Sequence, residues 1–84
     1  MKPGHIVIIW PNGTKIQATT AEEAEDIVRN SQFEVLSKVA FREMMCKRIK
    51  KKVGIVIDQD GSSLDFLYEL ERGQVLTVGI YYEK

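Results

Sequence analysis

Residues 5–18 constrain the fold more than any other part of the chain. His5–Trp10 is rich in β-branched residues, which favour strands, and Pro11–Thr14 follows it with turn-forming residues. Lys15–Ala18 then alternates polar and apolar side chains, as a half-exposed strand does. The pattern predicts a β-hairpin with a type I′ turn centred on Asn12-Gly13.

The first strand of this hairpin is apolar on both faces. Val7 and Ile9 point to one side, and Ile6, Ile8 and Trp10 point to the other. We therefore expect it at the centre of a sheet and the alternating second strand at an edge. In a chain of 84 residues, helices can cover only one face of that sheet. The other face needs a connector, a second copy of the protein or a partner to cover it.

The next segment predicts a helix that begins after Thr20 and ends near Asn30. Thr20–Glu23 fits a capping box, in which the Thr20 hydroxyl accepts from the Glu23 N–H and the Glu23 side chain reaches back. Acidic residues in the first turns, Glu25 among them, suit the helix dipole. The inward stripe is expected at Ala21, Ala24, Ile27 and Val28.

A second helix is predicted from Lys38 to Val53, with Ser37 as its N-cap and Gly54 as a left-handed residue just after it. The preceding residues, Gln32–Leu36, fit either a loop or a helical turn. The helix pattern rests on apolar residues at three- and four-residue spacing: Phe41, Met44, Met45, Ile49 and Val53.

The last third of the chain predicts a third helix and a closing strand. Ile55–Ile57 is either a short strand or a buried connector, and a turn at Asp58–Gly61 leads to a helix capped by Ser62 or Ser63. Arg72-Gly73 ends that helix, and Val75–Tyr82 forms the strand. The helix should bury Leu64, Leu67 and Leu70, with Phe66 outside this stripe.

These elements predict an α+β fold in a single domain, residues 1–84. A small, mainly antiparallel three-stranded sheet combines the N-terminal hairpin with the C-terminal strand, and two to three helices pack on one face. No apolar run approaches the roughly 20 residues of a membrane span, and no signal-peptide pattern is present. A single free Cys fits a reducing compartment, so the protein is expected to be cytoplasmic and not bound to a membrane.

Charge is segregated along the chain although 12 basic residues balance 12 acidic ones. Residues 29–52 hold eight bases and two acids, and residues 55–72 hold five acids and one base. The basic segment is a candidate nucleic-acid surface, or else a solvated helix end paired with acids of the third helix. Net neutrality and the lack of aromatic residues among the bases argue against nucleic acid. The candidate contacts are Arg42, Lys47, Arg48, Lys50, Lys51 and Lys52.

The residues for catalysis or metal binding are sparse. With one His and one Cys, the chain offers no convincing catalytic triad or zinc site. Asp58, Asp60, Ser62 and Glu69 have calcium-loop spacing, but Ser63 occupies the position that requires glycine. We therefore expect no cofactor, no metal and no enzymatic activity.

The doubly apolar strand and the terminal aromatic residues suggest an interaction surface instead. Its candidate residues are Val7, Ile9, Trp10, Tyr81 and Tyr82, of types enriched in interface cores. The expected function is a small interaction module that binds another macromolecule or itself as a homodimer. A nucleic-acid-binding protein that uses Lys47–Lys52 is the alternative.

Four segments also resemble small accessory proteins of phages and prophages. These are the hairpin Ile8–Ile16, the helix start Thr19–Ala24, the run Phe41–Arg48 and the stretch Asp65–Leu70 before a final strand. The resemblance implies an accessory protein of a mobile element, located in the host cytoplasm, that modulates a host or viral macromolecule. It implies no catalytic residues.

Overall fold

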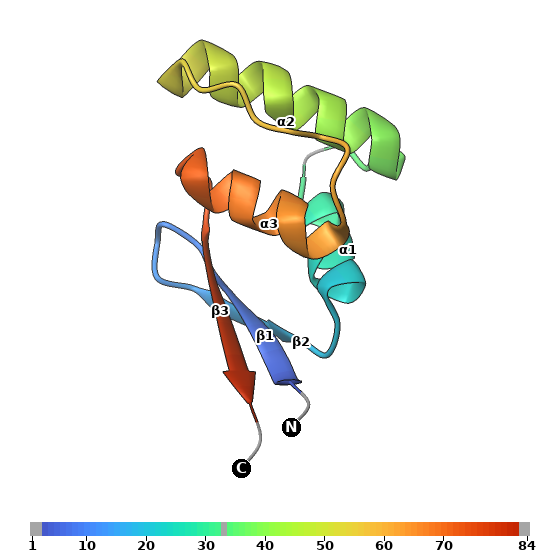
Figure 1. The fold of residues 1–84 in the computed structure, drawn as a ribbon, viewed down its shortest axis with the longest axis vertical. Coiled ribbons are helices and arrows are strands. Elements are labelled where there is room, and N and C mark those ends of the chain that lie inside the picture. The colour runs from blue at the N-terminus through green and yellow to red at the C-terminus, as the bar shows by residue number, and fades with distance from the viewer. Residues whose placement is uncertain (1–2, 33, 83–84) are drawn as a thin grey trace.

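The computed structural model describes residues 3–32 and 34–82, and its sheet confirms the predicted α+β fold (Figure 1). The strands are β1 (Pro3–Ile9), β2 (Lys15–Ala18) and β3 (Thr77–Tyr82). They pair antiparallel in the order β2-β1-β3. The doubly apolar β1 is therefore central, and the alternating β2 forms an edge, as expected.

The turn between β1 and β2 differs from the predicted type I′ turn. That turn needs a positive φ at both Asn12 and Gly13, but among the described non-glycine residues only Gln74 has one. Instead, Gly13 donates its N–H to the Trp10 carbonyl and Trp10 donates to the Thr14 carbonyl, both at 2.9 Å. The fixed φ of Pro11 suits the first central position of a type I turn, and Gly13 (φ 91°) supplies the left-handed residue of a three-residue loop.

The three helices are α1 (Ala21–Asn30), α2 (Lys38–Val53) and α3 (Ser63–Arg72). Their N-caps are Thr20, Ser37 and Ser62, each of which accepts a hydrogen bond from a backbone N–H of the first turn. The capping box expected at Thr20 is only half formed, because the Glu23 carboxylate accepts from the Thr19 hydroxyl instead. A complete box forms at α3, between Ser62 and Asp65.

The helices form two layers over one face of the sheet. α1 and α3 pack against the strands, and α2 lies outside them, farthest from the sheet (Figure 1). The core cluster contains Ile6 and Ile8 from β1 together with residues of all three helices. Val7, on the opposite face of β1, is not part of that cluster.

Phe66 is fully buried, contrary to the expected apolar stripe of α3. Its ring meets Phe41 of α2 edge to face, with 6.0 Å between the centroids. Because α3 lies between the sheet and α2, it buries side chains toward both. The resulting buried set is Ser63, Phe66, Leu67 and Leu70, while Leu64 is only partly buried.

The connector Ile55–Ile57 forms no strand and does not cover the open face of the sheet. It runs along α2 toward α3 (Figure 1). Ile57 is buried in the core, whereas Val56 is 71% exposed. Of the two interpretations left open, that of a connector is confirmed, but its position leaves the other face of the sheet without a covering element among the described residues.

The turn from α3 to β3 is closed by backbone hydrogen bonds at the end of the helix. Val75 donates its N–H to the Leu70 carbonyl at 3.0 Å, and Gln74 donates to the Glu71 carbonyl at 2.9 Å, which is a Schellman motif. The left-handed position belongs to Gln74 (φ 64°) and not to Gly73. Gly73 is required for a different reason, because an added Cβ would lie 2.6 Å from Cδ1 of Ile49.

Candidate functional site

The basic end of α2 is the most strongly charged surface of the described chain. α2 is the outermost layer, and its residues Lys47, Arg48, Lys50, Lys51 and Lys52 are all exposed. A shallow depression on this helix is lined by four of them: Lys47, Arg48, Lys51 and Lys52. They share one helix face because residues three to four apart are neighbours on a helix surface. We call this depression with its four side chains the basic face.

Most of these bases have no ion-pair partner among residues 3–32 and 34–82. Lys47 pairs with Glu43 at 3.2 Å, but no ion pair links Arg48, Lys50, Lys51 or Lys52 to an acid within residues 3–32 and 34–82. The acids of α3 are engaged elsewhere. Glu69 pairs with Arg72 at 2.8 Å, Glu71 accepts from the Val78 N–H, and Asp65 caps the helix. The predicted pairing of this run with the third helix is therefore absent.

Arg42, predicted as a nucleic-acid contact, is instead a structural residue. Its Nε and Nη2 donate to the two carboxylate oxygens of Glu25 at 2.8 and 2.9 Å. Its Nη1 donates to the carbonyls of Gln59 and Gly61 at 2.9 and 2.7 Å, and the guanidinium lies over the Phe66 ring. With its side chain 12% exposed, Arg42 joins α1, α2 and the turn before α3 and is not part of the basic face.

Glu25 is the unexpected partner in this junction. Its side chain is completely buried, whereas the sequence pattern indicated only that an acid at this place suits the helix dipole. Burial raises the pKa of Glu25, but hydrogen bonds from Arg42 and Ser63 and the charges of Arg42 and Lys38 outweigh burial and lower it overall. Glu25 is therefore ionised in the folded protein near neutral pH.

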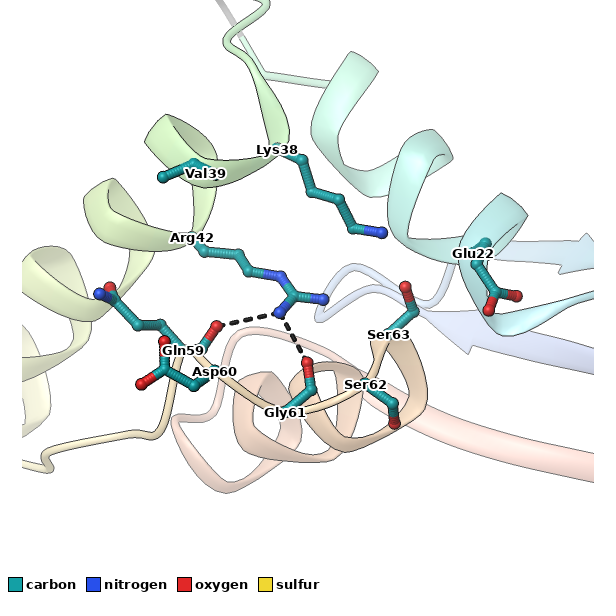
Figure 2. A pocket seen from close by; sticks show the side chains of 9 residues that line it. All are labelled: Glu22, Lys38, Val39, Arg42, Gln59, Asp60, Gly61, Ser62 and Ser63. Atoms are coloured by element: carbon teal, nitrogen blue, oxygen red, sulfur yellow. Dashed lines mark hydrogen bonds between the residues drawn. The ribbon is translucent and has the colours of Figure 1, made fainter.

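A cleft of about 490 Å³ opens beside this junction. Figure 2 shows Arg42 reaching across it from α2 to the backbone of the turn before α3, with Lys38 on the same side and Glu22 on α1 opposite. Its polar groups are largely committed to one another. Four of the five N–H groups of Arg42 have acceptors, Lys38 lies 3.7 Å from Glu25, and Ser62 caps α3. We interpret this cleft as a structural junction.

A second cleft, of about 370 Å³, lies where α2 meets the β1–β2 hairpin and the α3–β3 turn. Its lining includes Trp10, Met45, Arg48, Ile49, Lys52 and Gln74. Arg48 and Lys52 also line the depression of the basic face, so these two side chains border both hollows. The fold thus brings an aromatic ring from the first strand beside the bases, a combination that the sequence keeps apart. We call this hollow the Trp10 cleft.

The predicted interface residues do not form one surface. Val7 and Ile9 belong to the open face of the sheet, whereas Trp10 packs against the core on the helix side. Val7 is only 5% exposed, so it offers little area to a partner. The side chains of Tyr81 and Tyr82 lie outside the described residues. The most exposed large apolar side chains of the described part lie away from the strands, at Val35, Val39, Val53, Val56 and Tyr68.

Groups suited to catalysis are not assembled in the described part of the chain. No group of three or more His, Cys, Asp and Glu residues there is placed to hold a metal ion. Burial, and after it the negative charges of Asp58 and Glu69, raises the pKa of the Cys46 thiol, which weakens it as a nucleophile at neutral pH. A search of the described helices for one long and apolar enough to span a membrane finds none.

Comparisons with protein-family models, with curated proteins and with solved structures give no match for this chain.

Proposed function

We propose that this protein is a non-enzymatic binding module and that its basic face binds the phosphate backbone of a nucleic acid. The observation that carries the proposal is the cluster of exposed bases at the end of α2, of which only Lys47 has an ion-pair partner within the described chain. Lysine and arginine side chains that meet phosphates release condensed counterions, which drives association. Net neutrality does not oppose this mechanism, because Glu43 is the one acid in an ion pair with the basic face within residues 3–32 and 34–82.

The sheet supports a protein partner less well than the basic face supports a nucleic acid. A protein interface needs accessible apolar area at its centre, yet Val7 is nearly covered and Trp10 faces the other side of β1. Light scattering would detect a homodimer by its mass. The charged surface is the stronger candidate because its groups are exposed and, apart from Lys47, have no ion-pair partner within residues 3–32 and 34–82.

The wider role follows from the sequence resemblance. We propose an accessory protein of a phage or prophage, acting in the host cytoplasm on host or viral nucleic acid. A chain with a single cysteine, Cys46, is compatible with a reducing compartment.

The test is the salt dependence of binding, measured by fluorescence anisotropy with a labelled single-stranded oligonucleotide and with a duplex of the same length. Lys51→Gln removes a charge from the basic face and should reduce the slope of log K against log salt by about 0.7 for a single strand or about 0.9 for a duplex. Lys50→Gln is the matched control, because Lys50 is an exposed base on the same helix end but does not line the depression.

Two results would contradict the proposal. One is the absence of any anisotropy change with either nucleic acid at low salt. The other is an equal loss of affinity in Lys50→Gln and Lys51→Gln, which would show that the depression is not the contact surface. Light scattering on the same samples reports whether the bound species is a monomer or a dimer.

A further inference from the structure

The Trp10 cleft has the composition of a site for a flat, apolar ligand that carries negative charge. Met45 and Ile49 of α2 contribute to its lining and are only 1% and 2% exposed, so they form an apolar floor. Trp10, which is partly buried, contributes an indole ring at the end of β1. Arg48 and Lys52 add two positive charges to the same lining.

The size of the cleft fits a small planar group. Its volume of about 370 Å³ lies within the range of about 300–1,000 Å³ that is common for small-ligand pockets. The side chain of Gln74 adds an amide, and its backbone occupies the left-handed position that usually belongs to glycine. An amide can hydrogen-bond to donor and acceptor atoms on the edge of a base.

The positive charges of Arg48 and Lys52 have no ion-pair partner within residues 3–32 and 34–82. Arg48 has one weak contact to the Gln32 side-chain oxygen at 3.3 Å and one to the Met44 sulfur at 3.7 Å. Lys52 has no ion pair to an acid in residues 3–32 and 34–82. Because both residues also line the basic face, a phosphate chain that follows α2 would pass the mouth of the cleft.

We infer that the Trp10 cleft receives one unstacked base of a single-stranded nucleic acid, whose phosphates lie on the basic face. This inference rests on the proposed function and names its substrate class. A base stacks favourably on an aromatic ring, and the positive groove beside it follows the backbone. A regular duplex keeps its bases stacked inside, so it can contact the basic face but cannot fill the cleft.

The experiment uses Trp10 itself, because it is the single tryptophan of the chain. The intact protein is titrated at low salt with three unlabelled probes of equal length: a thymidine oligonucleotide, an abasic oligonucleotide with the same backbone, and a duplex. A base stacked on the indole quenches Trp10 fluorescence. We expect quenching by the thymidine oligonucleotide and none by the abasic strand or the duplex.

A pair of variants separates stacking from folding. Trp10→Leu keeps an apolar side chain but removes the ring, and it should weaken binding of the thymidine oligonucleotide about fivefold to 100-fold. Its affinity for the abasic strand should be unchanged. Trp10→Phe keeps an aromatic ring and should retain most of the affinity. Circular dichroism establishes that both variants are folded, and the quenching result on the unmodified protein does not depend on either.

The outcomes distinguish the two proposals. Equal binding of all three probes without quenching would overturn the cleft inference while leaving the basic face as a nucleic-acid surface. Binding of none of them would overturn both. Quenching by the thymidine strand with selective loss in Trp10→Leu supports the inference, and the same titration with an RNA oligonucleotide shows whether ribose is also accepted.

Discussion

Arg42→Met would leave the buried carboxylate of Glu25 without its main partner. Methionine keeps an unbranched stem of similar length, so the change removes chiefly the guanidinium. In the native protein that group donates two hydrogen bonds to Glu25 and two to the carbonyls of Gln59 and Gly61. Lys38, at 3.7 Å and 45% exposed, is too distant and too well solvated to replace it.

The expected cost at neutral pH is a large part of the total stability. Removing one member of a buried ion pair costs about 3–5 kcal/mol. Protonation of Glu25 sets an upper limit on this loss of stability. Protonating a carboxyl with an ordinary pKa of about 4.3 costs about 4 kcal/mol at pH 7. The two lost hydrogen bonds to backbone carbonyls add about 1 kcal/mol each. A domain of this size is stable by only about 4–13 kcal/mol in total.

The stability of Arg42→Met relative to the native protein should depend on pH in a definite direction. The pKa of Glu25 is lowered in the folded protein, so its contribution to stability is present above about pH 4.3 and is lost as the pH falls through the folded value. In Arg42→Met burial dominates, and the pKa of Glu25 becomes raised. The variant should therefore gain stability relative to the native protein as the pH falls from 7 toward about 4.5.

Urea unfolding followed by far-ultraviolet circular dichroism measures this at about pH 7 and about pH 5. The double variant Glu25→Gln/Arg42→Met is the reference, because it lacks the titrating carboxylate and should show little of the pH effect. The reasoning is refuted if Arg42→Met loses less than about 1 kcal/mol at pH 7, the value of an exposed ion pair. It is equally refuted if the difference between single and double variants does not shrink on acidification.

Two further predictions concern the turn after α3. Gln74→Gly should raise the free energy of unfolding by about 0.5–1 kcal/mol, because glycine adopts a φ of 64° without strain; Gln59→Gly, at a position without positive φ, should lower it in the same urea titration. Gly73→Ala should lower it by about 1–3 kcal/mol, since the new Cβ would meet the Ile49 side chain. In an Ile49→Val background, which lacks Cδ1, the loss should be smaller, and an equal loss would show that the contact is not its cause.

The parts of the fold that were predictable from sequence are those set by near neighbours. The N-cap hydroxyls of Thr20, Ser37 and Ser62 act on residues three positions ahead, so the starts of α1 and α2 were predicted correctly and the cap of α3 was narrowed to Ser62 or Ser63. The central position of β1 followed from its apolar residues on both faces, and the edge position of β2 followed from its alternation. The β1–β2 turn was predicted at the right place, but its type was wrong, because Pro11 has a fixed negative φ that suits a type I turn whereas Asn-Gly favours type I′.

Features that depend on distant elements were not predictable. Phe66 is buried only because α2 packs over α3, and nothing in ten residues of helix shows that a second layer lies above them. Glu25 has the local setting of a solvated acid, and its burial is explained by Arg42, which is 17 residues away. The charge of Arg42 was noticed, but its partners could not be assigned.

The candidate site contains features set by sequence neighbours and features set by distant elements. The bases of α2 were recognisable as a run along the chain, and their exposure follows from the outer position of the helix. Their neighbour Trp10 was singled out for a different role on the sheet, because no local pattern links the end of β1 to the end of α2. The basic run contains no aromatic residue along the sequence, but the fold places Trp10 in the same cleft as Arg48 and Lys52.

The pairing of the first strand with the last has a consequence for how the chain acquires its structure during synthesis. Ile6 lies opposite Ile80 and Ile8 opposite Val78, so β3 completes the sheet only after all three helices have been made. Contacts between residues so far apart in the sequence require a large loop to close, so the stabilising β1–β3 contacts form late in folding. The hairpin and the helices can form while the chain is on the ribosome, but one side of β1 stays open until Thr77–Tyr82 has emerged. We therefore expect the sheet to be completed in a late step, after Thr77–Tyr82 has been synthesised.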